Sequence, residues 1–345
     1  PLTWSDDHFD RHAREVFAHQ YETVEPYRRF CDGRGITPQN LAVWTDVPAV
    51  PTDVFKTVRL SNAADPVRTF LTSGTTQGRR GAHHFATLDH YRAAIFEPFR
   101  RFCLPDLGAS RRIPMLALAP SPGEMPESSL SYMLGELLER FGHPMWSGFF
   151  LARGDDGEYG FDFDALVDAL EQIRGPVMLL GTAFAFVDFF DAVDLDFALA
   201  AGSRVMETGG LKGKSRDVPR PELYQMFADR LGIAPTHRLG EYSMTELSSQ
   251  AYSDSLHREV GWDDSVFRVP PWVRVVAVDP ATLAPLPAGE PGLLRWYDLA
   301  NRDSVLAVQT ADLGIVTRDG GFELHGRAKG AQLRGCSLAI EELRP

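Results

Sequence analysis

The chain has 345 residues, of which 44% are hydrophobic, and a formal net charge of -12 at pH 7. This length and apolar content suffice to bury a large core in one big domain or two. The acidic balance disfavours nucleic-acid backbones and anionic membrane surfaces as main partners, because both reward a basic face.

The cysteines and the start of the chain indicate the compartment. Cys31, Cys103 and Cys336 are odd in number and far apart, which fits neither a disulfide framework nor a zinc site and favours a reducing environment. No apolar run reaches the length of a membrane span, and residues 1–7 lack the basic and apolar regions of a signal peptide. We therefore expect a cytoplasmic protein without a membrane span.

Residues 1–60 are expected to form an N-terminal helical cap. Between residues 5 and 31, aromatic and apolar side chains are scattered among charges, which predicts one or two amphipathic helices. From Val47 to Lys56, two prolines favour an extended path. Lys56 itself is interpreted as a surface lysine.

The next segment crowds hydroxyls, glycines and cations together, and it reads Thr72-Ser73-Gly74-Thr75-Thr76-Gln77-Gly78-Arg79-Arg80-Gly81. Glycines let backbone N–H groups approach phosphate oxygens, hydroxyls add donors and arginines offset negative charge. Apolar residues precede this segment and a helical pattern from Leu88 to Phe102 follows it. We predict a strand, a polyphosphate-binding loop and a helix in that order, with an ordinary solvated turn as the alternative. The loop is not a P-loop, which would end in Gly-Lys-Ser/Thr.

Residues 61–260 are predicted to form an α/β nucleotide-binding core, because apolar runs alternate with helical patterns from residue 113 to residue 245. Strands are expected at 113–119, 144–151 and 177–180, and helices at 128–141 and 163–173. Ligands of such sheets lie beyond the carboxyl ends of the strands. Two turns expected there contain Gly209-Gly210 and Tyr242-Ser243-Met244-Thr245-Glu246.

Residues 261–325 change to short β-rich pieces separated by Pro, Gly and Asp. The pieces at 272–278, 293–297, 305–308 and 313–317 predict an antiparallel meander. Residues 326–345 follow as a separate C-terminal segment.

The segment from Tyr242 to Glu246 combines an aromatic face for a base, a hydroxyl for a phosphate and a carboxylate for magnesium. Each part fits ATP, whereas the alternative is a plain turn at the end of a strand with an exposed Glu246. If Glu246, and Asp312 further along, contact the ligand from turns at the ends of strands, both carboxylates are expected to be exposed when ATP is absent.

The glycine loop resembles the phosphate loop of the adenylate-forming superfamily, Thr-Ser-Gly-Thr-Thr-Gly-x-Pro-Lys-Gly, with Arg80 at the position of the lysine. The segment Tyr242–Glu246 resembles its Tyr-Gly-x-Thr-Glu motif, Thr310-Ala311-Asp312 its Thr-Gly-Asp stretch, and Gly326–Gly330 its hinge. The resemblance implies a large domain with mainly parallel sheets flanked by helices and a β-rich subdomain, with the small C-terminal domain truncated or absent.

The same resemblance implies a role for each matched residue. Thr72, Ser73, Gly74, Thr75, Thr76 and Arg80 would bind the phosphates of ATP, and Gly209 and Gly210 would also belong to the ATP-binding site. Tyr242 would stack on adenine, Thr245 would contact the α-phosphate and Glu246 would bind Mg²⁺. Asp312 would take the ribose hydroxyls, and Arg327 would contact ribose or phosphate.

Over its full length the chain is similar to the LuxE-type acyl-protein synthetases, through residues 128–133, 206–214 and 241–252. Members activate fatty acids and carry the acyl group on a cysteine near the C-terminus, which implies Cys336 as the nucleophile. Arg334 nearby favours the thiolate, and the alternative is a buried structural cysteine. Cys31 and Cys103 lie in apolar helical patterns and are expected in the core. Lys212 or Lys214 would replace the lysine of the missing small domain, with a solvated basic turn as the alternative.

These features predict ATP-dependent activation of a carboxylic acid, in particular a fatty acid, as acyl-AMP, with transfer to a thiol. The thiol acceptor is its own Cys336, an acyl-carrier protein, coenzyme A or a partner reductase. One alternative is an acyl-CoA or carrier-protein ligase of the phenylacetate-CoA ligase type. Another is a nucleotide- or acyl-binding module that has lost catalysis.

Overall fold

The computed structural model describes residues 4–73, 79–108, 111–153, 159–209, 218–257 and 265–328. The chain divides into two compact units, each built from segments far apart in the sequence. The first unit comprises residues 1–94, 244–250 and 268–345, and the second unit comprises residues 95–243 and 251–267. None of the helices in the described ranges is both long and apolar enough to span a membrane. The four-part domain division at residues 60, 260 and 325 stays a prediction.

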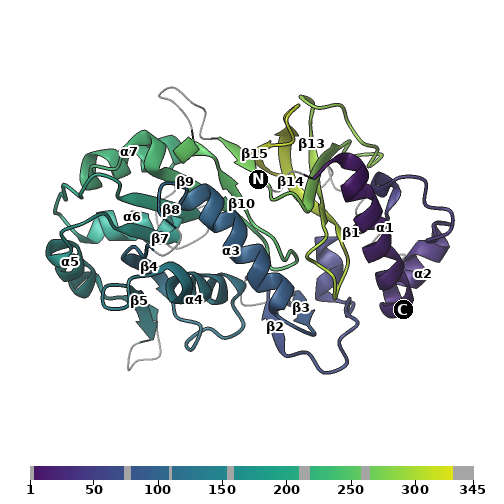
Figure 1. Cartoon of the computed structure of the whole chain (residues 1–345), viewed down its shortest axis with the longest axis horizontal. Helices are drawn as coiled ribbons and strands as arrows, with labels where there is room; N and C mark the ends of the chain where they lie inside the picture. The colour runs from purple at the N-terminus through teal and green to yellow at the C-terminus, as the bar shows by residue number, and fades with distance from the viewer. Residues whose placement is uncertain are drawn as a thin grey trace. The chain divides into compact units, whose positions relative to one another are not determined.

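The second unit is built on a mainly parallel sheet (Figure 1). Parallel pairing joins neighbours in the order β9, β8, β7, β4, β5. Their bounds are β4 Met115–Pro120, β5 Gly148–Arg153, β7 Met178–Thr182, β8 Arg204–Thr208 and β9 Arg238–Tyr242. Shorter strands extend the sheet, namely β6 Tyr159–Phe161 beyond β5, and β10 Ala251–Ser253 and β11 Val266–Arg268 beyond β9.

Continuous apolar runs form the central strands because a parallel sheet is covered on both faces. The first five residues of β4 are all buried. One face packs on α5 (Phe163–Gln172), α6 (Ala183–Ala192) and α7 (Arg220–Leu231) around Leu116, Leu179 and Val205. Helix α4 (Ser129–Phe141) is capped at its N-terminus by Ser128, whose side chain accepts a hydrogen bond from the N–H of Ser131. The predicted strands and helices from residue 113 to residue 180 are therefore confirmed, with shifted ends.

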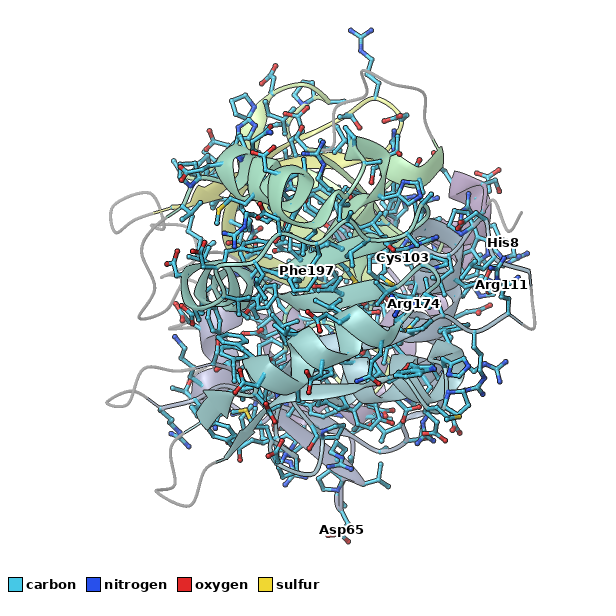
Figure 2. All side chains as sticks on the ribbon, turned by 90° about the vertical axis from the view of Figure 1, so that its left-hand side faces the viewer. His8, Asp65, Cys103, Arg111, Arg174 and Phe197 are labelled. Carbon is cyan, nitrogen blue, oxygen red and sulfur yellow. The ribbon has the colours of Figure 1, made fainter. Side chains whose placement is uncertain are left out.

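Helix α3 (Asp89–Cys103) belongs to both units, with the boundary between Ala94 and Ile95. Its second half packs in the second unit, where the ring of Phe99 stacks 5.7 Å from that of Phe141 in α4. Cys103, labelled in Figure 2, is fully buried, as is Cys31 in the first unit. The expectation that these two cysteines lie in the core is confirmed.

The first unit begins with two helices, α1 (Asp6–Thr23) and α2 (Glu25–Gly33), as predicted. They pack together through Phe17 and Tyr27, whose rings lie 6.1 Å apart. The expected extended path from Val47 to Lys56 is wrong after Pro51. Strand β1 spans only Val50–Pro51, and a 3-10 helix, η2 (Thr52–Lys56), follows. Short 3-10 turns also lie at η1 (Trp44–Asp46), and in the second unit at η3 (Pro235–His237) and η4 (Ser255–His257).

The meander of the first unit consists of β12 (Val273–Val278), β13 (Pro291–Asp298), β14 (Ala307–Val316) and β15 (Phe322–Arg327), and consecutive strands of the meander pair antiparallel. β1 adds to β14 in parallel. The two strands expected at 305–308 and 313–317 are wrong, because both belong to β14. The polar residues between them do not end the strand, since Thr310 is buried and its hydroxyl donates to the carbonyl of Leu294 at 2.7 Å.

The segment around the glycine loop is a β-hairpin, so the predicted order of strand, loop and helix is wrong. Strand β2 (Arg68–Leu71) pairs antiparallel with β3 (Ala82–Phe85), and α3 follows only then. His83 and Phe85 alternate with more exposed neighbours, which is the two-residue period of a strand. Four residues of such a pattern are too few to stand out in the sequence.

Candidate active site

The base of the glycine loop is closed by hydrogen bonds between its two strands. The N–H of Thr72 donates to the carbonyl of Gly81 at 2.9 Å, and the N–H of Gly81 donates to the Thr72 hydroxyl at 2.9 Å. A Cβ on Gly81 would lie 3.0 Å from Cγ2 of Thr72 and 3.4 Å from Cβ of Phe55, so this position favours glycine. Ser73 is exposed. Gly74, Thr75 and Thr76 lie outside the described residues.

Arg80 holds the hairpin together as well as supplying charge beside it. Its Nε donates to the carbonyl of Thr72 at 2.7 Å and its Nη2 to the carbonyl of Leu71 at 3.2 Å. These bonds direct the guanidinium along the exit of β2, where the loop begins. The phosphate contacts assigned to Thr72, Ser73 and Arg80 stay predictions.

The first unit brings together three of the predicted site residues, Glu246, Asp312 and Arg327. Asp312 on β14 lies directly opposite Arg327 on β15, and the Nε of Arg327 is 2.9 Å from Oδ1 of Asp312. The expectation that Glu246 and Asp312 are exposed is wrong, because each residue is only 8% exposed. Asp312 lies within a strand and not at its end, and Glu246 lies in a turn that packs against the interior of the unit.

Charge and burial act together on Glu246. Burial raises the pKa of this carboxyl to about 7, the charges of Arg327 and Lys56 oppose the rise, and the charge of Asp312 adds to it. Lys56 is the exposed surface lysine that the sequence predicted, and its charge still acts on Glu246. Its side chain is 46% exposed and pairs with Asp53 at 2.6 Å.

These residues fit a magnesium ion. No described side chain donates a hydrogen bond to the Glu246 carboxylate, and a divalent cation would offset its unfavourable burial. Among the described residues no group of three or more His, Cys, Asp or Glu side chains forms an all-protein metal cage. Mg²⁺ is commonly held by one or two carboxylates together with substrate phosphates, which matches a site with Glu246 alone or with Asp312.

The second unit holds the other part of the predicted site, at the carboxyl ends of β8 and β9. Gly209 follows β8 with a φ of +73°, in the left-handed region that favours glycine. Tyr242 ends β9, and its ring lies 6.3 Å from that of Phe267. Gly210 and Lys212 lie outside the described residues. The boundary between the units falls between Ser243 and Met244, inside the predicted motif.

Glu241 is a buried carboxyl that sequence reasoning did not single out. It is 3% exposed, and one of its oxygens accepts a hydrogen bond from the Thr208 hydroxyl. Burial raises its pKa to about 7, hydrogen bonds with Thr208 and Ser243 oppose the rise, and the charge of Glu207 adds to it. The sequence indicated Glu241 only through its place directly before Tyr242, within the stretch 241–252 that resembles the LuxE-type proteins.

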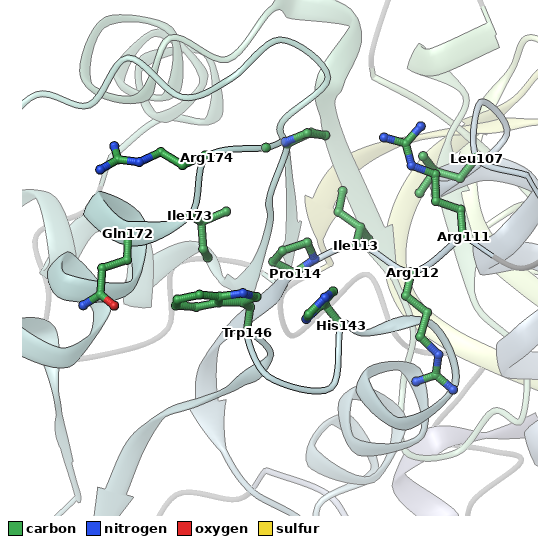
Figure 3. A pocket seen from close by; sticks show the side chains of 12 residues that line it. Leu107, Arg111, Arg112, Ile113, Pro114, His143, Trp146, Gln172, Ile173 and Arg174 are labelled. Carbon is green, nitrogen blue, oxygen red and sulfur yellow. The ribbon is translucent and has the colours of Figure 1, made fainter.

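A pocket of about 390 Å³ in the second unit lies at the amino ends of β4 and β7, away from the carboxyl ends where Gly209 and Tyr242 lie (Figure 3). Its lining includes Ile113 and Pro114 before β4, and Gly175 and Pro176 before β7. The arginines around it do not converge on one point in Figure 3, and Arg112 donates to the carbonyls of Glu139 and Gly142 at 2.8 and 3.0 Å. This pocket contains none of the predicted site residues.

Comparison with known proteins identifies the family. The family described as "Acyl-protein synthetase, LuxE" matches residues 1–343. The chain belongs to this family. A long-chain-fatty-acid--luciferin-component ligase of Aliivibrio fischeri is 23% identical over 320 residues, covering 89% of this chain and 79% of that protein. The protein of the same name from Vibrio harveyi is 22% identical over 351 residues, covering 96% of this chain and 87% of that protein.

Solved structures of adenylate-forming enzymes share the fold. A 2-hydroxyisobutyryl-CoA ligase in the postadenylation state with R3-HIB-AMP matches with a TM-score of 0.66 and 18% identity, over 93% of this chain and 67% of that chain. ATP-bound MatB from Rhodopseudomonas palustris matches with a TM-score of 0.53 and 17% identity, over 77% of this chain and 48% of that chain. This chain therefore matches about half of MatB.

These findings confirm the superfamily and the fold class predicted from the sequence, a mainly parallel sheet with flanking helices and a β-rich part. Membership of the family also confirms the predicted enzyme class, an adenylate-forming acyl-protein synthetase that activates an acyl group.

Proposed function

We propose that this chain activates a long-chain fatty acid with ATP and Mg²⁺ and passes the acyl group to the thiol of Cys336. The names of both bacterial relatives specify a long-chain fatty acid, and ATP is bound in MatB. The observation that carries the proposal is the meeting of Glu246, Asp312 and Arg327 in one unit, with the ion pair of Asp312 and Arg327 at 2.9 Å. Three motifs of a nucleotide site, spread over some eighty positions, converge there.

The side chains of the first unit divide the work on the nucleotide. The carboxylate of Asp312 accepts hydrogen bonds from the ribose hydroxyls, and the guanidinium of Arg327, paired with it at 2.9 Å, orients that carboxylate. The Glu246 carboxylate would hold Mg²⁺, which when bound neutralises charge on the phosphates, and the Thr245 hydroxyl would contact the α-phosphate. The cations Arg80 and Lys56 add to this neutralisation, so that catalysis of the first step is mainly positioning and charge stabilisation.

Two bond exchanges make up the reaction. A carboxylate oxygen of the fatty acid attacks the α-phosphorus of ATP, so that an O–P bond forms and the bond to pyrophosphate breaks. A thiolate then attacks the acyl carbonyl carbon, an S–C bond forms, and AMP leaves with the electron pair of the broken C–O bond. The thiol proton goes to solvent before the attack.

The acceptor has a second candidate, coenzyme A. A 2-hydroxyisobutyryl-CoA ligase in complex with 2-HIB-AMP and CoA matches 93% of this chain with a TM-score of 0.64. Under this alternative the first step is unchanged, and labelled acid reaches coenzyme A and not the protein. An acyl-carrier protein or a partner reductase would receive the acyl group after Cys336.

Exchange of labelled pyrophosphate into ATP tests the first step. In Glu246→Gln and Asp312→Ala we expect exchange at subsaturating ATP to fall about a hundredfold or more, because each variant loses a contact with the nucleotide or its metal. Glu290→Gln removes an exposed carboxylate of the same unit and is the matched control, with unchanged exchange. Wild-type exchange in a folded Glu246→Gln or Asp312→Ala variant would refute the corresponding assignment.

A further inference from the structure

Two buried side chains hold the backbone of the turn that carries Thr245 and Glu246. The Nδ1 of His83 lies 2.7 Å from the carbonyl oxygen of Thr245, and the Nδ2 of Asn301 donates to the carbonyl oxygen of Glu246 at 3.0 Å. Both side chains are 1% exposed. Because a carbonyl only accepts, His83 carries its proton on Nδ1.

The surroundings of His83 fix its ring and its protonation state. The ring lies 4.2 Å from that of Phe85 and 6.1 Å from that of Phe55, centroid to centroid. Burial lowers the pKa of His83 to about 4, against the effect of the bond to Thr245, so that the imidazole is neutral at pH 7. The side chain of Asn301 also acts on this ring and, like the bond to Thr245, opposes the fall in its pKa.

The position of His83 in the hairpin shows which segments its hydrogen bond to the Thr245 carbonyl joins. His83 lies opposite Phe70 in the hairpin, two residues after Gly81, where β3 leaves the glycine loop. One hydrogen bond thus ties the strand that leaves the loop to the turn that carries Glu246. All the residues concerned belong to the first unit.

Asn301 holds the other side of the turn. Besides Glu246, its Nδ2 donates to the carbonyl of Val305 at 2.8 Å, and its Oδ1 accepts from the Ser248 hydroxyl at 3.1 Å. The side-chain amide of Gln20 in turn donates to the carbonyl of Asn301 at 2.8 Å. Every hydrogen-bonding atom of the Asn301 side chain is therefore used.

The residues after the turn are fixed in the same way by Asp298, which is fully buried. Its carboxylate accepts from the backbone N–H of Ser248 at 2.9 Å and of Ser249 at 2.8 Å, and from the Ser249 hydroxyl at 2.8 Å. Buried networks in which each partner is satisfied specify one arrangement, and partial loss leaves a costly unpaired group.

We propose that His83 and Asn301 are positioning residues for the metal–nucleotide step, because they fix the backbone from which the Thr245 hydroxyl and the Glu246 carboxylate project. The inference rests on the proposed role of Glu246 and adds the residues that make it effective. Neither side chain contacts the reacting atoms. A displacement of about 1 Å in such a group costs on the order of a hundredfold in rate, so the two hydrogen bonds act on catalysis through geometry.

Two substitutions at His83 separate the effect of its Nδ1–H donor from the effect of the size of its side chain. In His83→Leu we expect the Mg²⁺ concentration for half-maximal pyrophosphate exchange and the KM for ATP to rise about tenfold or more, with the KM for the fatty acid unchanged. In His83→Asn the amide nitrogen is bonded to Cγ, as Nδ1 is in histidine, so it replaces the donor and keeps both parameters within about threefold of wild type.

His84→Leu is the matched control on the same strand. His84 faces the other side of the hairpin, where its Nδ1 lies 2.8 Å from the Thr69 hydroxyl, and we expect unchanged dependence on Mg²⁺ and ATP. A folded His83→Leu variant with wild-type Mg²⁺ dependence overturns the proposal. Equal losses in His83→Leu and His83→Asn also overturn it, because the donor is then irrelevant.

If His83→Leu does not fold, Asn301→Asp decides the question. It keeps the size of the side chain but replaces the donor to the Glu246 carbonyl by an acceptor, and the same rise in Mg²⁺ requirement is expected. Glu246→Gln separates this inference from the proposed function. Unchanged Mg²⁺ dependence in Glu246→Gln refutes the metal role itself, whereas loss in Glu246→Gln without loss in the His83 and Asn301 variants refutes only the positioning.

Discussion

Glu246 combines burial with the absence of a hydrogen-bond donor from any described side chain. A carboxylate in such a place is expensive when ionised, which is why burial raises its pKa to about 7. Functional sites often retain groups of this kind, and the cost appears in the stability of the ligand-free protein. Under the proposed metal role, magnesium and nucleotide would relieve that cost on binding, and Glu246 would link ligand binding to stability.

The pH dependence of stability follows from the raised pKa of Glu246. Its protonated form is favoured in the folded state, so its stabilising contribution is complete below about pH 4.5 and is lost as the pH rises through about 7. Glu246→Gln is neutral at every pH. In EDTA at pH 8 we therefore expect its melting temperature to exceed that of wild type by about 2–5 °C, with the difference vanishing near pH 5.

Thermal melts of both proteins between pH 5 and pH 8 measure this difference, and Glu290→Gln is again the control because that carboxylate is exposed. A Glu246→Gln variant less stable than wild type at pH 8 would mean that the ionised carboxylate is well solvated or paired. The gain in stability together with the loss of exchange would mark Glu246 as a residue kept for function.

At the scale of elements, the strand pair β14 and β15 determines where Asp312 and Arg327 meet. The register shifts between Leu313 and Gly314, the two residues that directly follow Asp312. A Cβ on Gly314 would lie 2.1 Å from the carbonyl oxygen of Glu323 and 3.0 Å from a methyl of Leu294. The close approach of β15 therefore requires glycine at position 314, and we expect the ion pair of Asp312 and Arg327 to depend on it.

Gly314→Ala tests this dependence. The added methyl group cannot avoid the backbone of β15 without moving the strand, so we expect a loss of about 2 kcal/mol or more in the free energy of unfolding and a weaker affinity for ATP. Gly160→Ala on β6 is the control, because a Cβ there meets nothing within 4 Å. Denaturant unfolding and exchange kinetics measure both effects, and wild-type values in Gly314→Ala would contradict the assigned register.

The same scale shows where sequence patterns suffice and where they fail. Long apolar runs predicted β4 and β7, because burial on both faces leaves a continuous signal over five or six residues. The hairpin strand β3 has four residues, two of them histidines, and its pattern is too short to be separated from the helix that follows. In β14 the polar Thr310 and Asp312 interrupted the apolar pattern, because their partners lie on neighbouring strands.

At the scale of the whole molecule, the order of the motifs predicted which site residues lie close together. It did not predict the buried hydrogen bonds that fix their backbone. The sequence indicated Glu246, Asp312 and Arg327, and the first unit brings all three together. His83, Asn301 and the buried state of Glu246 escaped prediction, because they depend on contacts between segments more than fifty residues apart. The unit boundary between Ser243 and Met244, inside the motif Tyr242–Glu246, is not marked by any change in local composition either.

The location of the cysteines in the whole chain leads to the last prediction, which concerns the acyl acceptor. The sequence has three cysteines, and two of them are buried, which raises the pKa of Cys31 to about 12 and that of Cys103 well above its ordinary value. Thiols of this kind are poor nucleophiles, because the thiolate is the attacking species. Cys336 lies outside the described residues and stays the predicted nucleophile, with Arg334 two positions before it in the sequence.

We therefore expect the enzyme to form a thioester on Cys336 when incubated with ATP, Mg²⁺ and a labelled fatty acid in the absence of coenzyme A. The label should be released by hydroxylamine, should persist in Cys31→Ala, and should be absent in Cys336→Ser, while pyrophosphate exchange in Cys336→Ser continues because the first step needs no thiol. Label that survives in Cys336→Ser would place the acceptor elsewhere on the chain. Label that appears only on added coenzyme A would assign the enzyme to the acyl-CoA ligases, since the intermediate would then react with a free thiol and not with its own.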